Sequence, residues 1–236
     1  MKQPAALSTA CSAMLVVLIL LTLTTGALPA DTCDSLSVLA LSITKTNQKG
    51  DQLCWAATAQ MAMSMFPSPD GKDVPQCEQA NKRFGKADCC PKVPGIEAHC
   101  DRTGWPEFEK YEFHALQGNI ANWSELLLYL CKRRTPVLYA YSYLQDTALH
   151  MKIAYGFQIL PNQSKAVYFI DPGDPVGGFE DEVLLFDTWF TGGNPDIHRQ
   201  TDYFDVCPFS YLVNGSCSTS PPDTRPPKVP LGLTIR

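Results

Sequence analysis

The sequence predicts a single α+β domain, with a helical part near residue 54 and a mainly antiparallel β-sheet after residue 136. Two patterns lead to this class. A run of good helix formers follows Cys54 and stops at the proline- and glycine-containing segment 67–71. Three stretches rich in β-branched and aromatic residues then follow Pro136. The composition, 45% hydrophobic and 18% charged, is ordinary for a globular protein, and nothing in it indicates a second domain.

Residues 1–26 have the layout of a secretory signal peptide. Lys2 precedes an apolar segment of roughly a dozen residues, and small residues stand near Gly26. The segment is shorter than the roughly 20 apolar residues that span a bilayer. We therefore expect cleavage near Gly26-Ala27 and a secreted protein without a stable membrane anchor. The folded domain is expected over 27–218, followed by a flexible, proline-rich tail over 219–236.

Charge argues against a nucleic-acid partner. The formal net charge is −5, and the largest basic cluster is Lys132-Arg133-Arg134, which we interpret as the solvated end of a helix. We expect a monomer.

The cysteines indicate an oxidised protein. Of the ten cysteines, Cys11 lies in the predicted signal and Cys54 starts the helical run. An even set remains, and an exported chain oxidises cysteines that can pair, so we expect four disulfides. The set is Cys33, Cys77, Cys89, Cys90, Cys100, Cys131, Cys207 and Cys217.

A metal site is the alternative for part of this set. Cys77, Cys89, Cys90, His99 and Cys100 lie close together in the sequence, but their spacing is not a paired C-x-x-C arrangement. We therefore expect neither a metal nor another cofactor, and we interpret His99 as a surface histidine.

Cys54 is expected at the N-terminus of a central, buried helix. Apolar residues cover most of the helical run, so little of it is free to face water. The unpaired N–H groups and the positive dipole end of a helix N-terminus favour a thiolate. The sequence thus offers a nucleophile.

The second half of the chain predicts one helix and four strands. Asn122 or Ser124 can cap a helix that ends near Arg134. Strands are expected over 137–141, 150–159, 166–170 and 183–190.

The predicted hairpin brings a base to a carboxylate. A turn centred on Pro161-Asn162 would place His150 opposite Gly173, with Asp171 two residues away from that pair. Cys54, His150 and Asp171 then have the types expected of nucleophile, base and orienting residue. Each has a structural alternative. Cys54 could be a buried or disulfide-bonded thiol, His150 a core histidine, and Asp171 a turn residue that Asp174 replaces.

Particular motifs resemble the papain-like cysteine proteases. Gln48 stands six residues before Cys54, and a tryptophan follows that cysteine directly. The stretches CWAATAQM, QCEQANKRFGKADCC, TPVLYAYSYL, HMKIAYGF and VYFIDP look more closely like the papain-like peptidases that include bacterial avirulence effectors and are akin to bacteriocin-leader peptidases. The resemblance covers roughly residues 45 to 175.

The resemblance implies a papain-like fold and a residue-by-residue assignment of roles. Cys54 would be the nucleophile, His150 the base, Asp171 the residue that orients the imidazole, and Gln48 an oxyanion-hole donor. The chain departs from the family where Ala148-Leu149 stands in place of the glycine usual before the histidine, so the approach to His150 is expected to be narrower.

Three asparagines head N-x-S sequons, which accept glycans in a eukaryotic secretory pathway. They are Asn122, Asn162 and Asn214.

The function expected from these features is a secreted cysteine protease that hydrolyses peptide bonds in proteins or peptides. Two alternatives remain open. One is a catalytically inactive, disulfide-stabilised binding module of the same fold. The other is an amidase or transpeptidase that uses the same three residues.

Overall fold

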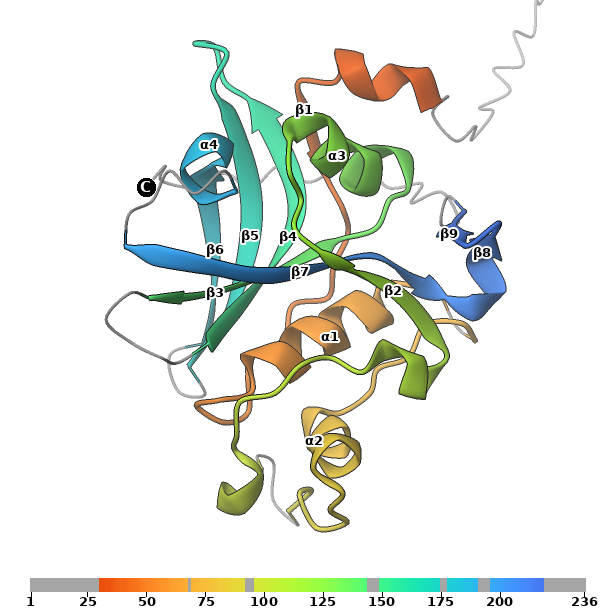
Figure 1. The fold of residues 1–236 in the computed structure, drawn as a ribbon, viewed down its shortest axis with the longest axis vertical. Coiled ribbons are helices and arrows are strands. Elements are labelled where there is room, and N and C mark those ends of the chain that lie inside the picture. The colour runs from red at the N-terminus through yellow and green to blue at the C-terminus, as the bar shows by residue number, and fades with distance from the viewer. Residues whose placement is uncertain are drawn as a thin grey trace, which may run out of the picture.

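The computed structural model describes residues 30–67, 69–91, 96–143, 149–174, 178–190 and 196–218. The predicted signal at 1–26 and the predicted tail at 219–236 lie outside these residues, as do 27–29. The described chain combines helices with antiparallel sheet (Figure 1). None of its helices is long and apolar enough to cross a membrane.

Within the described residues, the main sheet has seven strands, in the order β2-β7-β3-β4-β5-β6, and all pairings are antiparallel. The remaining strand, β1, pairs with the C-terminal part of β4, beyond the residues of β4 that pair with β3. A separate hairpin contains β8 and β9. The strands are β1 (Val38–Ala40), β2 (Phe113–Gly118), β3 (Val137–Tyr143), β4 (Leu149–Ile159), β5 (Lys165–Asp174), β6 (Gly178–Leu185), β7 (Ile197–Pro208), β8 (Leu212–Val213) and β9 (Ser216–Cys217).

Four α-helices accompany the sheet in the described chain. They are α1 (Cys54–Ser64), α2 (Gln76–Phe84), α3 (Trp123–Leu127) and α4 (Phe186–Trp189). A π-helical turn extends α3, and short 3₁₀ turns join other elements. These turns are Leu128–Lys132 (π) and Ala30–Ser35, Ala98–Cys100, Phe108–Tyr111 and Phe209–Tyr211 (3₁₀).

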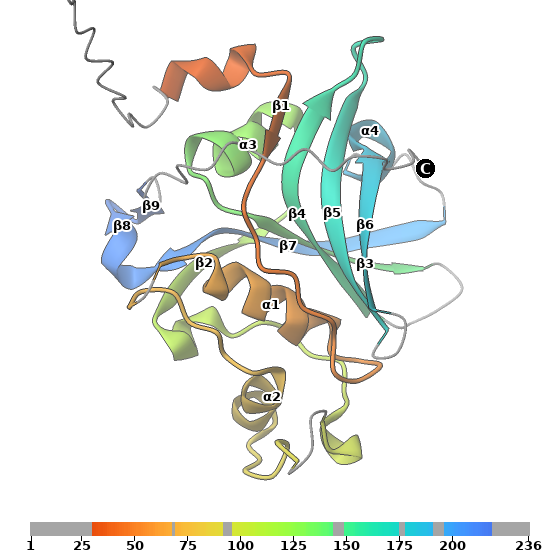
Figure 2. The ribbon, with the colours of Figure 1, turned by 180° about the vertical axis from the view of Figure 1, so that it is seen from behind.

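Helix α1 lies between the sheet and α2, as both views of the ribbon show (Figures 1 and 2). Nine of its eleven residues are buried. Alanines at 56, 59 and 62 let the helix approach its neighbours closely, while Trp55 and Met61 fill the larger spaces. The helix ends at Ser64, three residues before Pro67. Cys54 is therefore held at the start of a rigid, central element.

Two predicted elements differ from the structure. The helix capped by Asn122 changes to a π-helical turn after Leu127 and ends at Lys132. The strand expected over 183–190 ends at Leu185, and a short helix follows it. The reason is aromatic spacing: Phe186 and Phe190 are four residues apart and stack with ring centroids 5.2 Å apart, which suits a helical turn better than a strand.

The β4–β5 hairpin has the predicted register in its central part. Ile153 pairs with Ile170 and Ala154 with Phe169, as a turn at Pro161-Asn162 requires. Closer to the turn than these two pairs, an irregularity between Ala154 and Gly156 shifts the register by one residue. A Cβ at Gly156 would lie 2.4 Å from the carbonyl oxygen of Leu39, so only glycine allows β1 to approach here.

Four disulfides bind the eight cysteines expected to pair, and Cys54 is the free cysteine of the described chain. One disulfide spans 98 residues and ties the first 3₁₀ turn to the π-helical turn. The pairs are Cys33–Cys131, Cys77–Cys90, Cys89–Cys100 and Cys207–Cys217.

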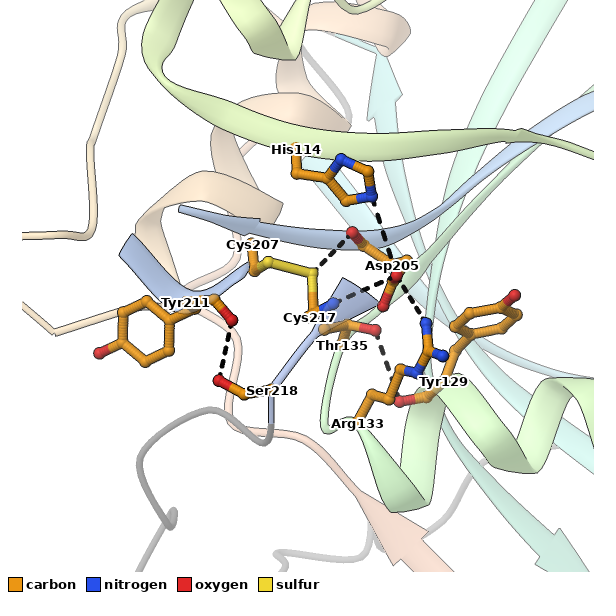
Figure 3. Close-up of a disulfide and its surroundings, with 9 residues drawn as sticks. All are labelled: His114, Tyr129, Arg133, Thr135, Asp205, Cys207, Tyr211, Cys217 and Ser218. Carbon is orange, nitrogen blue, oxygen red and sulfur yellow. Dashed lines mark hydrogen bonds and ion pairs between the residues drawn. A yellow bond between two sulfur atoms is a disulfide. The ribbon is translucent and has the colours of Figure 1, made fainter. Parts of the chain in front are cut away.

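A buried carboxylate fastens the C-terminal hairpin (Figure 3). Asp205 is fully buried, and its Oδ2 lies 2.5 Å from Arg133 Nη1 and 3.8 Å from His114 Nε2. The same oxygen accepts a hydrogen bond from the Cys217 backbone N–H at 3.3 Å. The sequence predicted that Arg133 belongs to a solvated helix end, and this was wrong. Arg133 pairs with Asp205 instead, because a buried charge requires an opposite charge beside it.

Candidate active site

Cys54 is the first residue of α1 and is buried, with 6% of its surface exposed. The carbonyl of Leu53 accepts hydrogen bonds from the N–H groups of Ala56 and Ala57, both at 3.0 Å. The first turn carries no acidic side chain. The positive end of the helix dipole is thus not offset by a neighbouring carboxylate in that turn, which favours negative charge on the sulfur.

His150 is the second residue of β4, and the start of that strand meets the start of α1. The Cys54 thiol lies within donating range of the Leu149 carbonyl, with 3.8 Å between sulfur and oxygen. The ring of Tyr141 packs edge-on against the imidazole, with centroids 5.6 Å apart. Leu149 is half-buried, and Ala148, the other residue expected to narrow the approach, lies outside the described residues.

Asp171 of β5 contacts the imidazole from the neighbouring strand. Its Oδ1 lies 2.8 Å from His150 Nε2 and also accepts a hydrogen bond from the Gly173 backbone N–H at 2.9 Å. Burial alone would raise the pKa of Asp171, but the hydrogen bond and charge of His150, with Lys152 nearby, hold it well below its usual range. Asp171 is therefore a carboxylate at neutral pH. Asp174, the alternative, ends β5, and its side chain lies outside the described set.

The electrostatics of His150 favour an imidazolium. Burial alone would lower its pKa, but hydrogen bonds with Asp171 and Cys54, and the negative charges of both groups, raise the pKa to about 9. Because Nε2 faces Asp171, Nδ1 is the nitrogen left for Cys54. The three residues singled out in the sequence thus lie together, although they come from α1, β4 and β5.

Gln48 is buried rather than exposed in a loop. Its backbone N–H donates to the Pro172 carbonyl at 3.2 Å, which joins its segment to the residue after Asp171. Its side-chain Nε2 donates to the Asp51 carbonyl at 3.3 Å, while its Oε1 has no hydrogen-bond partner. The segment is close to the histidine–aspartate pair, and the amide faces its own loop.

Two residues that the sequence analysis missed fix the loop before Cys54. The buried Gln76 amide accepts from the Lys49 backbone N–H and donates to the Asn47 carbonyl, both at 2.8 Å. The Asp101 carboxylate accepts from the N–H groups of Asp51 and Gln52, both at 2.8 Å. No local pattern could identify these residues, because the loop lies far from both in the sequence.

A third group missed from the sequence lies beside Asp171. Lys152 Nζ is 3.1 Å from Asp171 Oδ2 and 2.6 Å from Glu182 Oε2. One signal in the sequence could have identified it: Lys152 follows His150 by two residues on a predicted strand, which puts both side chains on the same face.

The cysteines of the alternative metal site are bonded in disulfides. Ligand atoms of Asp88, Cys89, His99 and Cys100 lie within 4.8 Å of one another. Because Cys89 and Cys100 are bonded together, neither offers a thiolate. Asp88 and His99 remain, an exposed pair with 3.1 Å between Oδ1 and Nε2.

The three sequon asparagines are all exposed. Asn122 caps α3, where its Oδ1 accepts from the Glu125 N–H at 2.9 Å. Asn162 lies in the β4–β5 turn and Asn214 in the β8–β9 turn. The exposure is compatible with glycans, and their presence stays a prediction.

Comparisons with known proteins show a distant structural likeness. No protein-family model and no curated protein matches the chain. Among solved structures, the chain is similar to the bromelain protease from Ananas comosus in complex with the E64 inhibitor, with 14% sequence identity and a TM-score of 0.40. The match covers 72% of this chain and 98% of that one.

Proposed function

We propose that this protein is a cysteine protease of papain-like fold that hydrolyses peptide bonds through Cys54, His150 and Asp171. The observation that carries the proposal is the meeting of a free cysteine, the first residue of α1, with a histidine and a carboxylate from separate strands. A disulfide partner or a core histidine would not need this arrangement. The other cysteines of the described residues form disulfides, so the unpaired Cys54 is the exception among them.

The first half of the proposed reaction forms an acyl-enzyme. The Cys54 thiolate attacks the carbonyl carbon of the scissile peptide, and the carbonyl oxygen takes the negative charge. The Cys54 backbone N–H would stabilise this oxyanion, joined by the Gln48 amide once it turns from the Asp51 carbonyl. His150 donates its Nδ1 proton to the leaving amine, the C–N bond breaks, and a thioester remains.

The second half returns the enzyme to its starting state. His150, now neutral, accepts a proton from water, and the resulting nucleophile attacks the thioester. The C–S bond breaks and releases the carboxylic acid and the Cys54 thiolate. Asp171 keeps Nε2 protonated throughout, so that Nδ1 is the nitrogen that exchanges protons.

We further propose that the protein acts outside the cell, as a monomer on protein or peptide substrates. The four disulfides support an oxidising compartment, because such bonds are rare in the cytosol. Expression of the full chain in a eukaryotic secretory host tests this directly. Secreted protein should begin near Ala27 by N-terminal sequencing and should shift in size on glycosidase treatment.

Labelling by an epoxysuccinyl cysteine-protease inhibitor tests the enzymatic proposal. We expect one adduct per chain, on Cys54, and none in Cys54→Ser. Absence of label in folded wild-type protein would favour the inactive binding module instead. A peptide-library cleavage assay beside a cell-wall release assay then separates a protease from an amidase or transpeptidase.

A further inference from the structure

A buried lysine stands behind the proposed histidine–aspartate pair. The side chain of Lys152 is 4% exposed, yet it carries an ammonium group. Burial alone would lower the pKa of Lys152, but the charges of Asp171 and Glu182 and its hydrogen bonds to them raise it above the ordinary value. Burying a charge is costly unless it is paired, and an apolar side chain would pack at this position without that cost.

Strand register gathers the four charged groups. His150 and Lys152 project from the same face of β4, because side chains alternate along a strand. Continuing the pairing of Ile153 with Ile170 brings Lys152 opposite Asp171. Glu182 of β6 pairs with Phe169, two residues from Asp171 on β5. Adjacent strands β4, β5 and β6 thus contribute a row of groups that alternate in charge.

The contacts along this row use both oxygens of Asp171. Oδ1 faces His150 Nε2 at 2.8 Å, and Oδ2 faces Lys152 Nζ at 3.1 Å. Glu182 Oε2 lies on the other side of the ammonium, at 2.6 Å. A carboxylate held at both oxygens cannot rotate away from the imidazole without breaking an ion pair.

Aromatic rings shield the lysine from water. The ammonium lies 5.5 Å from the ring centroid of Tyr141 and 5.3 Å from that of Trp189. Both distances suit a cation–π contact. Exclusion of water strengthens the ion pairs, because charges interact more strongly where the dielectric constant is low.

We propose that Lys152 and Glu182 are positioning residues of this site: Lys152 fixes Asp171 so that its Oδ1 faces His150, and Glu182 holds Lys152 in place. The assignment rests on the proposed function. Neither residue touches substrate in this scheme. Their charges also oppose each other near the imidazole, since Lys152 disfavours the imidazolium and Glu182 favours it.

The test separates the effect of positioning from the effect of charge. The titratable groups around His150 are Cys54 from α1, Tyr141 from β3, Lys152 from its own strand, and Asp171 and Glu182 from β5 and β6. Burial raises the pKa of Tyr141, so its hydroxyl stays neutral through the range of interest. Variants at 152 and 182 therefore change the charge near His150 and, by the proposal, also release Asp171.

Two substitutions should both lower the pKa of His150. Removal of the positive charge in Lys152→Met would by itself raise this pKa, but release of Asp171 weakens the hydrogen bond that raises it, and we expect a net fall of about 1 unit. Glu182→Gln should lower the pKa by a similar amount, because it removes a negative charge and loosens Lys152. The measurement is the NMR titration of the histidine ring nitrogens, with His99 and His198 as internal controls. The alkaline limb of kcat/KM should move with the NMR values. We also expect kcat to fall about 10-fold in Lys152→Met, with KM nearly unchanged and with recovery in Lys152→Arg.

The outcomes separate this inference from the proposed function. The inference is overturned if Lys152→Met raises the pKa of His150 or leaves it as in the wild type, even where the melting temperature falls. Lys152→Gln, which also removes the charge, takes its place if Lys152→Met does not fold. A lower pKa of His150 in both variants of a protein without hydrolytic activity would support the positioning network and reject the protease.

Discussion

The Cys54 sulfur lies 3.8 Å from the carbonyl oxygen of Leu149, the residue immediately before His150. This contact joins the first residue of a helix to the first residue of a strand 95 positions later. Cys54 is buried and Leu149 half-buried at this contact, and Trp55 and Met151, a little further along the two elements, are core residues. The sulfur and the imidazole are consequently held together before any substrate arrives, as a nucleophile–base pair requires.

Alkylation tests the state of the Cys54 thiol. Native, unreduced protein treated with iodoacetamide at about pH 6 should be labelled at Cys54, because a protonated His150 and the helix N-terminus both stabilise a thiolate there. Peptide mass mapping locates the label and also reads the disulfides. A label on another cysteine, or Cys54 found in a disulfide, would remove the nucleophile and with it the proposed enzyme.

Replacement of His150 should abolish turnover without preventing folding. We expect His150→Ala to reduce kcat/KM by roughly 100-fold or more through loss of general acid–base catalysis. The residue lies at a strand end with a quarter of its side chain exposed, so secretion should persist. His198→Ala, an exposed histidine on β7, is the matched control and should retain activity. The opposite result for the two histidines would show that the wrong base was chosen.

Asp171→Ala should impair the enzyme less than Cys54→Ala, because an orienting residue forms no bond to substrate. Its loss should also move the alkaline limb of kcat/KM to lower pH, since the hydrogen bond to Asp171 helps to raise the pKa of His150 to about 9. The comparison is with Asp174→Ala, which should have a mild effect. A larger loss of kcat/KM in Asp174→Ala than in Asp171→Ala would show that Asp174, and not Asp171, orients the imidazole.

The His150–Asp171 pair should make stability depend on pH. A histidine whose folded-state pKa is raised to about 9 contributes stability that is complete below its unfolded pKa of about 6.5 and disappears as the pH rises through about 9. The lowered pKa of Asp171 gives a contribution present above about pH 4 and lost as the pH falls further. The pair therefore stabilises the fold most between about pH 4 and about pH 6.5.

Melting temperatures of wild type and His150→Gln measure this effect. The difference between them should be largest near pH 5.5 and should shrink by pH 10. A difference for His150→Gln that stays level across this range would contradict the raised pKa of His150.

Local pattern was enough to predict the elements that bring the candidate residues together. Proline and glycine mark the end of the helix that starts at Cys54, and a turn at Pro161-Asn162 aligns His150 with Asp171. The even number of the other cysteines and the oxidising compartment expected for an exported chain were enough to separate Cys54 from the paired cysteines. Which cysteines pair was beyond the sequence, because many connectivities fit the same set.

The elements that escaped prediction depend on non-local contacts. Strand β7 carries buried acids at Asp202 and Asp205, so its pattern does not look like that of a central strand. Arginines stabilise both: Arg199 pairs with Asp202 from three residues away, and Arg133 reaches Asp205 from another element. Gln48 is buried because Gln76, 28 residues later, bonds to its two neighbours.

The long-range disulfide should stabilise the fold more than the short one at the C-terminal hairpin. Cys33–Cys131 closes a loop with a sequence separation of 98, against 10 for Cys207–Cys217. The chain-entropy relation gives about 5 kcal/mol for the first and about 3 kcal/mol for the second, because a longer loop restricts the unfolded chain more. Urea unfolding of the two paired Cys→Ser variants, Cys33→Ser with Cys131→Ser and Cys207→Ser with Cys217→Ser, measures the difference.

All four sulfurs are buried, so the loss of packing is comparable in the two variants. Labelling of Cys54 should survive in the second variant, because its disulfide joins β7 to β9 and not the elements that carry Cys54, His150 and Asp171. An equal or reversed order of stability would mean that the Asp205 network, rather than chain entropy, dominates at the C-terminal disulfide.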